Sequence, residues 1–278
     1  MTVVTREDIR KAAEALGLAQ GDTVLIHSSF KSFGYVEGGA EAVIGGFRDA
    51  IGEEGTLVFP TLCQQDWGNV YANWHMDAKS DVGYLTEYFR KLPGATRSNQ
   101  ATHSVAAKGK LGKYITKTHG ITGKRYGIFG ETPFSADSPW EKMYNLNTKM
   151  LFLGVGIRKC TLRHYVEYCF VEKYLKKIEC SAKYDLAKSK LQSYGKRGVW
   201  PQVVSEHVRE VMTERGLVKY GRCGDADLIL VNAQDFYATA MELLENRCVD
   251  VYADSELWRT ADTFAWLDLV GSIIEEGI

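Results

Sequence analysis

The sequence is poor in the features that mark several specialised classes of protein. It has five prolines among 278 residues, six cysteines and a formal net charge of −1. A chain this close to neutrality has no global basic field to attract nucleic acid or an anionic membrane. No apolar run reaches membrane-spanning length, and the N-terminus lacks the apolar core of a signal peptide. We therefore expect a cytoplasmic protein without a nucleic-acid or membrane partner.

The cysteines and histidines exclude further kinds of site. The cysteines are dispersed and form no C-x-x-C pair, which is typical of reduced and mostly buried thiols. The six histidines show no short spacing between potential ligands, so no metal is indicated. The chain also has no internal repeat, low-complexity tract or Pro/Ser-rich linker. We expect residues 1–278 to form a single domain.

The first sixty residues predict the fold class. A capping-box pattern at Thr5–Asp8 predicts a helix that ends at Gly17. A strand over 22–27, a helix from Gly38 and a strand over 56–60 follow at short spacing, which is the mark of an α/β domain with neighbouring parallel strands. Later patterns predict helices at 82–92, 139–144, 161–175, 201–215, 232–244 and 262–274, strands at 151–155 and 227–231, a hairpin within 177–200 and a turn at 221–224.

The stretch over residues 151–167 contains a candidate catalytic base. Leu151–Val155 is short, apolar and bounded by glycine, which favours a buried strand. Thr161 is a plausible N-cap of the next helix, whose apolar face is formed by Leu162, Tyr165, Val166 and Cys169. His164 then lies on the first turn of a helix at the carboxyl end of a strand. In open α/β sheets ligands bind at this position.

Glu167 lies three residues after His164 and projects from the same side of the helix. A carboxylate there raises the basicity of the imidazole and fixes its tautomer, as an acid–base histidine requires. The simpler interpretation is that His164 caps the start of the helix and that Glu167 is a solvated surface residue, because local His/Glu pairs are common.

The strand over 22–27 opens into a candidate phosphate-binding loop, Ser28–Gly34. Its small residues let backbone N–H groups approach a phosphate, and Lys31 adds positive charge. Two simpler alternatives remain, namely that the loop is a polar turn and that His27 is hydrogen-bonded in the core.

Two further segments are candidates for ligand binding. Residues 61–80 combine acidic and aromatic side chains, including Asp66 and Trp67, which suits a polyhydroxylated or cationic ligand. A surface loop with incidental aromatic residues is an equal alternative. Arg97 lies among serine and threonine residues and suits a phosphate or a carbonyl group.

Several motifs occur in an order that resembles the aminoglycoside 3-N-acetyltransferase family. They are His27–Gly34 with Gly38–Ala40, Gly55–Thr61, Phe89–Arg90, Pro93–Ser98, His103–Ala107, Ser138–Pro139, Leu153–Gly156, Thr161–Glu167 and Gly221–Ala226. The matches are collinear and cover most of residues 5–245. Each motif alone is weakly specific, but their ordered sum is strong.

The resemblance implies a three-layer α/β/α sandwich with a central mixed sheet. It implies a transferase that moves the acetyl group of acetyl-CoA to an amino sugar, with the 3-amine of aminoglycoside antibiotics as the leading acceptor and antibiotic resistance as the consequence. His164 is then the general base, assisted by Glu167. A small-molecule amino sugar is the expected partner, and a homodimer is left open.

The resemblance also implies which residues hold the two substrates. Acetyl-CoA would be held by His27, Ser28, Ser29, Lys31, Ser32, Phe33, Gly34, Arg97, Ser98 and Ser104. The acceptor would contact Asp66, Trp67, His103 and Thr161. In a covalent alternative Cys160, four residues before His164, accepts the acetyl group first.

Two departures from the family bear on the acceptor. Resistance enzymes usually show a histidine and a proline after the Arg-Ser pair, where this chain has Asn99-Gln-Ala101. They also carry an acid-rich stretch after the central helix, whereas residues 184–202 here are basic. A basic segment suits an acceptor that carries phosphate, such as a nucleotide-linked amino sugar of polysaccharide synthesis. A third alternative is a catalytically silent binding protein that keeps the fold.

Overall fold

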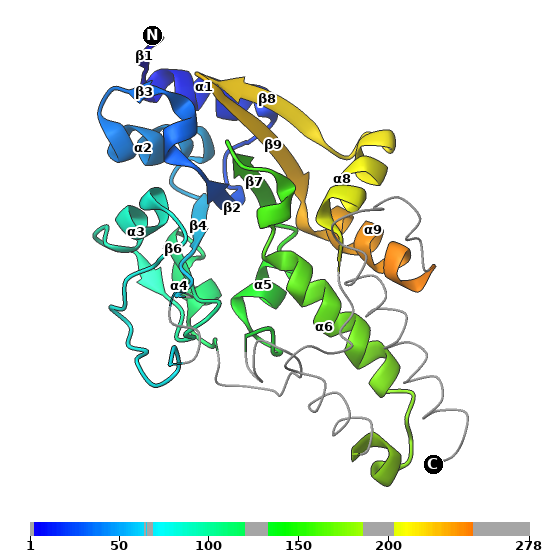
Figure 1. Ribbon diagram of the computed structural model, residues 1–278. Coiled ribbons are helices and arrows are strands. Elements are labelled where there is room, and N and C mark those ends of the chain that lie inside the picture. Colours follow the sequence, from blue (N-terminus) through cyan, green and yellow to red (C-terminus); the bar gives the residue numbers. More distant parts are fainter. Residues whose placement is uncertain (1–2, 64, 66–68, 120–132, 186–202, 247–278) are drawn as a thin grey trace.

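The computed structural model describes residues 3–63, 65, 69–119, 133–185 and 203–246, and its strands form a central layer (Figure 1). Within these residues the main sheet has seven strands in the order β5-β6-β4-β2-β7-β9-β8. The three central strands are parallel to one another, and each outer strand is antiparallel to its inner neighbour. The central strands are β2 (Thr23–Ser28), β4 (Thr56–Pro60) and β7 (Lys149–Leu153), and the outer ones are β5 (Thr96–Arg97), β6 (Val105–Gly109), β8 (Lys219–Cys223) and β9 (Ala226–Asn232).

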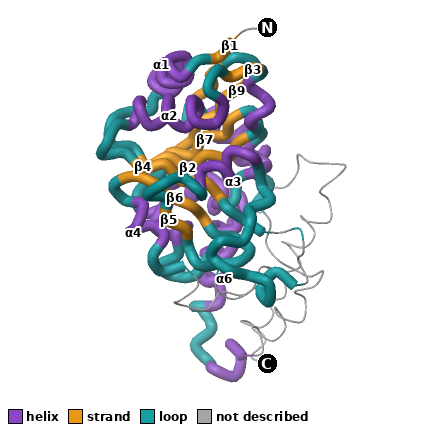
Figure 2. The backbone as a smooth tube through the Cα atoms, turned by 90° about the vertical axis from the view of Figure 1, so that its left-hand side faces the viewer, coloured by secondary structure: helices purple, strands orange, loops and turns teal. Residues whose placement is uncertain are grey.

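Helices cover both faces of this sheet (Figure 2). Alternate residues of a strand point to opposite faces, so β2 contributes Ile26 to one core and Leu25 to the other. The first face is covered by α1 (Arg6–Leu16), α2 (Gly39–Ile51) and α3 (Tyr84–Arg90), and the second by α4 (Gly112–Thr116), α5 (Pro139–Asn145), α6 (Leu162–Leu175), α8 (Ser205–Glu214) and α9 (Ala233–Glu245). The predicted three-layer α/β/α sandwich with a mixed sheet is confirmed.

Local sequence signals set several of these boundaries. Thr5 begins α1 with a complete capping box, and Gly17 ends it in the left-handed conformation at φ 103°. Ser138 caps α5, with Pro139 at its first position. A small parallel pair of strands, β1 (Val3–Val4) with β3 (Tyr35–Val36), lies beside the main sheet. No helix in the described ranges is both long and apolar enough to cross a membrane.

Some predicted elements are wrong in position, and some observed strands were not predicted. The central strand runs over Lys149–Leu153 rather than 151–155, because the Lys149 amine is anchored by Asp22 at 2.6 Å and Gly154 turns the chain at φ 60°. Helix α3 is shorter than the predicted 82–92, since Gly83 precedes it at φ 139°. The predicted turn at 221–224 is largely the end of β8. Strands β5 and β6 were not predicted, and the helix at 262–274 lies outside the described residues.

Candidate active site

A cavity of about 780 Å³ opens at the carboxyl ends of the central strands. Helix α2 follows β2 on one face, whereas α6 follows β7 on the other, so the chain changes face between these two adjacent strands. Such a switch point is where open α/β sheets bind ligands. The described lining residues are His27, Ser28, Pro60, Leu62, Asp81, Val82, Thr86, His103, Val155, Arg158, Lys159, Cys160, Thr161, Arg163 and His164.

His164 and Glu167 form a hydrogen-bonded pair on the first turns of α6. Nδ1 of His164 lies 2.7 Å from Oε2 of Glu167, whose side chain is fully buried. The other carboxylate oxygen, Oε1, accepts the backbone N–H of Val203 at 2.9 Å. The interpretation of Glu167 as a solvated surface residue is therefore wrong. A carboxylate on Nδ1 places the proton there and leaves Nε2 of His164 as the basic nitrogen.

The sequence places this pair through helix geometry. Positions three apart lie on one side of a helix, and α6 packs its neighbouring side chains, including Leu162 and Val166, into the core of the second face. A buried carboxylate is costly unless it is hydrogen-bonded. Here both oxygens of Glu167 have partners, and one partner is a ring that lines the cavity.

His103 is a second imidazole in the cavity wall. It is 1% exposed, and its ring meets that of His164 edge to face with 5.9 Å between centroids. Its Nδ1 lies 2.8 Å from the hydroxyl of Thr102 rather than from a carboxylate. Burial, and then the proximity of His164 and His119, hold the pKa of His103 well below its ordinary value. The ring of Phe134 packs against the rings of His103 and His164.

His27 and Thr161 lie together at the start of α6. Thr161 occupies the predicted N-cap position, but its φ and ψ are helical and its side chain makes no cap hydrogen bond, so the predicted cap is wrong. Its backbone N–H instead donates to Nε2 of His27 at 3.3 Å, and its hydroxyl lies at the same distance. Burial lowers the pKa of His27 to about 3. Among described atoms, Nδ1 of His27 and the hydroxyl of Ser28 are buried without a hydrogen-bond partner.

Of the predicted phosphate-binding loop over residues 28–34, only Ser28, the last residue of β2, is among the described residues that line the cavity. Ser28 lines the cavity, whereas Phe33 is fully buried in the core of the first face. Lys31 is exposed on a short 3₁₀ helix, η1 (Phe30–Phe33), and the hydroxyl of Ser32 donates to the carbonyl of Ser29 at 2.6 Å. Gly34 follows at φ 79°. The loop is thus a tight turn, and its buried apolar side chain, Phe33, packs in the core of the first face rather than in the cavity.

The side chains of Arg97, Ser98 and Ser104 form hydrogen bonds within the protein and are not among the described residues that line the cavity. The Arg97 guanidinium donates to the carbonyls of Thr61 at 2.6 Å and Met76 at 2.9 Å, and it stacks on Trp74 at 4.6 Å. A phosphate or a carbonyl group was predicted as the partner of Arg97, and the carbonyls found there belong to the chain itself. The hydroxyls of Ser98 and Ser104 are buried in hydrogen bonds to His119 and to Thr61. Asp66 and Trp67 lie outside the described residues.

Sequence reasoning missed the charged residues of the cavity. Arg158, Lys159 and Arg163 line it, two from the 3₁₀ helix η2 (Ile157–Lys159) and one from the first turn of α6. The sequence pattern that could have identified them is three cationic residues within six positions, shortly after the strand that leads to His164. Asp81 also lines the cavity, and its carboxylate accepts the backbone N–H of Gln65 at 2.7 Å.

Cys160 lies in the cavity wall but is 1% exposed. Burial raises the pKa of its thiol to about 12, so the thiolate is strongly disfavoured. This environment opposes the covalent alternative. No group of three or more His, Cys, Asp or Glu side chains within the described ranges has a geometry that could hold a metal ion.

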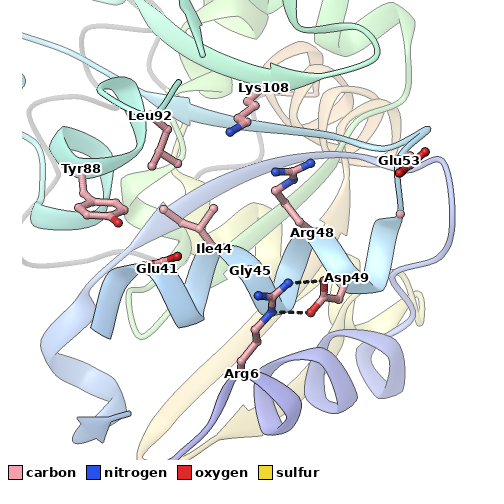
Figure 3. Close-up of a pocket in the computed structure, with 11 residues that line it drawn as sticks. Arg6, Glu41, Ile44, Gly45, Arg48, Asp49, Glu53, Tyr88, Leu92 and Lys108 are labelled. Carbon is pink, nitrogen blue, oxygen red and sulfur yellow. Dashed lines mark hydrogen bonds and ion pairs between the residues drawn. The ribbon is translucent and has the colours of Figure 1, made fainter. Parts of the chain in front are cut away.

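A second hollow, of about 520 Å³, lies between α1, α2, α3 and β6 (Figure 3). Arg6 is paired there with Asp49 at 2.6 Å, while Arg48 and Lys108 lie nearby. Burial and the neighbouring Arg48 lower the pKa of Lys108. No histidine occurs among the described residues that line this hollow, in contrast to the first cavity.

An α/β/α sandwich with a carboxylate-supported imidazole at the ends of its parallel strands is an enzyme scaffold suited to removing a proton from a bound ligand. Comparison with known proteins identifies the family. Residues 25–245 match the family model described as aminoglycoside 3-N-acetyltransferase. The chain belongs to this family.

Individual relatives agree with this assignment. The chain is 32% identical over 182 residues to aminoglycoside N(3)-acetyltransferase VII of Streptomyces paromomycinus, which covers 59% of this chain and 60% of that protein. It is 33% identical over 185 residues to the aminoglycoside N(3')-acetyltransferase-like protein YokD of Bacillus subtilis, covering 59% and 65%. A longer match of 258 residues at 29% identity joins it to aminoglycoside N(3)-acetyltransferase VIII of Streptomyces fradiae, covering 86% and 82%.

Solved structures share the fold. The apoenzyme of aminoglycoside acetyltransferase AAC(3)-IVa matches 96% of this chain and 99% of its own with a TM-score of 0.68 at 22% identity. The YokD structure matches 91% of this chain and 97% of its own with a TM-score of 0.67 at 24% identity. The whole α/β/α arrangement is therefore common to this chain and these enzymes.

Proposed function

We propose that this protein is an N-acetyltransferase that moves the acetyl group of acetyl-CoA to an amine of an amino sugar, in the first instance the 3-amine of an aminoglycoside. The observation that carries the proposal is the buried His164–Glu167 pair at 2.7 Å in the cavity of a chain that belongs to this family. Related structures support it: one neighbour is a binary complex with CoASH, and others hold a gentamicin or sisomicin.

The chemistry requires a base. An amine on a sugar is mostly protonated near neutral pH and must lose one proton to solvent before it can attack. As its nitrogen bonds to the thioester carbonyl carbon, it gives a second proton to Nε2 of His164, and the carbon–sulfur bond breaks. That proton then goes to the departing sulfur. Glu167 stabilises the imidazolium in between, and general base catalysis of this kind contributes about 10²- to 10⁴-fold.

The cavity suits the donor as well. Coenzyme A carries phosphates, for which Arg158, Lys159 and Arg163 supply positive charge. Nδ1 of His27 and the hydroxyl of Ser28 are buried polar groups without partners in the described chain, and a ligand oxygen would satisfy them. The volume of about 780 Å³ is in the range of small-molecule sites.

A second candidate acceptor is a nucleotide-linked amino sugar. Three cations but one carboxylate, Asp81, occur among the described residues that line the cavity. A polyamine antibiotic requires several carboxylates, because each ammonium group that is desolvated without a partner is costly. A phosphate-bearing acceptor instead suits this excess of positive charge.

The test is thiol release from acetyl-CoA over a panel of aminoglycosides and nucleotide-linked amino sugars, with the native protein and His164→Ala. The chain offers a matched control in His207→Ala, since His207 also precedes a glutamate, Glu210, by three residues on a helix but lies outside the cavity. We expect release with at least one amine, loss on the order of 10²-fold or more in His164→Ala and native activity in His207→Ala. A fully active His164→Ala refutes the base assignment, and CoA binding without transfer to any amine favours the silent protein.

A further inference from the structure

His27 is a buried imidazole near the carboxyl end of β2, and it borders the same cavity as His164. Its ring is 5% exposed and stacks on the ring of Phe152, its partner in register on β7, with 5.1 Å between centroids. Phe152 belongs to the core of the second face, which α6 also covers. His27 therefore lies on the same side of the sheet as the helix that carries His164.

One fixed donor determines where the ring of His27 carries its proton. The backbone N–H of Thr161 donates to Nε2 of His27 at 3.3 Å, and a backbone N–H can only donate. Nε2 is therefore an acceptor without a hydrogen, so the single proton of the neutral ring is on Nδ1. A reversed ring would turn a carbon atom toward that N–H and leave it without this acceptor. The hydroxyl of Thr161 lies at the same distance from Nε2, but the N–H alone already requires an acceptor there.

Nδ1–H of His27 is thus a buried donor, and it has no hydrogen-bond partner in the part of the chain that the structure describes. The buried ring of His119 shows the contrast. Its two nitrogens lie within hydrogen-bond distance of the hydroxyl of Ser98 and the carbonyl of Pro133, and it is not among the described residues that line the cavity. Buried polar groups are nearly always paired, and the exceptions require an explanation such as a catalytic role. The position of His27 in the cavity wall indicates that its donor serves a ligand.

The proposed reaction has one atom that needs such a donor. When the amine nitrogen bonds to the thioester carbonyl carbon, an electron pair of the carbon–oxygen double bond moves onto the oxygen, and it returns when the carbon–sulfur bond breaks. Donors held in place around that charged oxygen are usually the largest single contribution to catalysis.

The base and this donor must border one space, because the amine nitrogen and the oxygen are bonded to the same carbon. His27 and His164 meet this requirement. Thr161, whose N–H contacts His27, precedes His164 by three residues at the start of α6. Side chains at this spacing begin about 5 to 6 Å apart, measured between their Cβ atoms.

We propose that Nδ1–H of His27 donates to the carbonyl oxygen of the acetyl thioester and stabilises the negative charge that develops on it. This inference rests on the proposed acetyl transfer. His164 and His27 then have opposite tasks, since His164 accepts a proton whereas His27 keeps its own throughout. Burial lowers the pKa of His27 to about 3, which suits this task because the ring stays neutral and its Nε2 continues to accept the N–H of Thr161.

The first test uses the donor substrate without an acceptor. Long-range ¹H–¹⁵N spectra of histidine-labelled protein distinguish a ring protonated at Nδ1 from one protonated at Nε2, and His27 is assigned through its loss in His27→Asn. We expect the Nδ1–H form in the native protein. Acetyl-CoA should shift its Nδ1 resonance, whereas CoA, which lacks only the acetyl group, should not.

These spectra separate the two proposals. A His27 ring protonated at Nε2, or the same Nδ1 resonance with acetyl-CoA as with CoA, overturns the inference and leaves acetyl transfer intact. A protein that does not bind acetyl-CoA overturns both.

The second test compares two amides at position 27. The amide nitrogen of asparagine reaches approximately the position of Nδ1, whereas that of glutamine reaches the position of Nε2. His27→Asn therefore keeps a donor for the substrate and loses the contact with Thr161, and His27→Gln does the reverse. His27→Gln should lower kcat on the order of 30-fold, since a hydrogen bond to a charged group is worth about that factor, with the KM for acetyl-CoA within a few fold of native.

His27→Asn should keep more of its kcat than His27→Gln does, even where its melting temperature is lower. His119→Gln is the control for loss of a buried imidazole and should keep the native kcat. Equal losses of kcat in the two His27 variants, or a defect of His27→Gln confined to KM or to the melting temperature, contradict the catalytic role of His27.

Discussion

His103 and His164 border one cavity, and their surroundings make them chemically different. His164 has a carboxylate on Nδ1, whereas His103 has a hydroxyl there, at nearly the same distances of 2.7 and 2.8 Å. A carboxylate stabilises the protonated ring by charge, but a hydroxyl in a buried site only orients it. The same side chain is thus suited to act as a base in one position, whereas burial lowers its pKa in the other. The partner on Nδ1, rather than the histidine itself, determines the role.

The largest effect on kcat should come from removing the carboxylate that distinguishes the surroundings of His164 from those of His103. Glu167→Gln replaces the carboxylate of His164 with a neutral amide of the same shape, so the imidazolium loses its charge partner. We expect kcat to fall about 10²-fold with the KM for both substrates within a few fold of native. Steady-state kinetics of acetyl transfer provide the measurement. Glu210→Gln on α8 is the control, because that glutamate stands at the same spacing from His207 outside the cavity.

A smaller loss of kcat in Glu167→Gln would change the comparison between His164 and His103. If Glu167→Gln retains most of its kcat, orientation rather than charge is what His164 needs, and the two histidines then differ less than their partners suggest. Glu167→Leu separates these possibilities, since it removes both the charge and the hydrogen bond and leaves the backbone N–H of Val203 without its acceptor.

A second prediction tests the claim that a buried imidazole beside a hydroxyl stays neutral. His119 is also buried beside a hydroxyl, with Nδ1 2.8 Å from that of Ser98, while its Nε2 donates to the carbonyl of Pro133 at 2.7 Å. Burial outweighs this second hydrogen bond and lowers the pKa of His119 from 6.5 to about 3. The unfolded chain binds a proton at this position below pH 6.5, whereas the folded chain does so only near pH 3. The folded state therefore loses stability as the pH falls through this window, by about 2 kcal/mol at pH 5 for one such histidine.

Urea unfolding at pH 7.5 and pH 5 measures this loss. His119→Gln should lose less stability between the two pH values than the native protein does, by about 2 kcal/mol. The exposed His75 supplies the control, and His75→Gln should show the native pH dependence. Identical losses in His119→Gln and the native protein would mean that His119 is charged in the folded state, which would also weaken the assignment of His103 as neutral.

The contrast between the two histidines also explains what the sequence could predict. Glu167 was found because its partner lies three residues away on one helix, where spacing determines contact. The contact between Gln100 and the backbone N–H of His103 was not predicted, because it depends on the fold of a turn. Val203 meets Glu167 from 36 residues later in the chain. Arg97 was predicted to bind a phosphate or a carbonyl group, but the sequence did not show that it binds the carbonyls of Thr61 and Met76 in its own chain.

The fold shows the same division. Strands β2 and β4 were predicted because they are continuous apolar runs between turn signals. Strand β5 has two residues, β6 contains small alanines, and β8 is a polar edge strand with the sequence KYGRC. Such strands are set by pairing with a neighbour rather than by their own pattern. The central strands and the apolar outer strand β9 could therefore be predicted from the sequence. Strands β5, β6 and β8 could not, and Arg97 lies on β5.

A third prediction concerns the charge that surrounds both imidazoles. Arg163 lines the cavity from the first turn of α6, whereas Lys31 is exposed on the turn after β2 and is not among the lining residues. If the cavity cations hold the phosphates of the donor, Arg163→Gln should raise the KM for acetyl-CoA about tenfold, because a charge-assisted contact contributes about 1 to 2 kcal/mol. Lys31→Gln should change it less than twofold. The reverse order would restore the loop over 28–34 as the phosphate-binding segment.

The smallest effect on kcat is expected at Cys160. Its size shows whether His164 removes a proton from the sugar amine or from the Cys160 thiol. In the direct mechanism the sugar amine is the only nucleophile, and the buried thiol, with its pKa raised to about 12, is packing. Cys160→Ala should then keep kcat within about twofold of native, because deleting one buried sulfur atom leaves the reacting groups in place. Rapid-quench analysis should find no acetyl group on the protein. A rate that falls as far as in His164→Ala, together with an acetylated native enzyme, would mean that His164 activates a thiol rather than the sugar amine in the first half of the reaction.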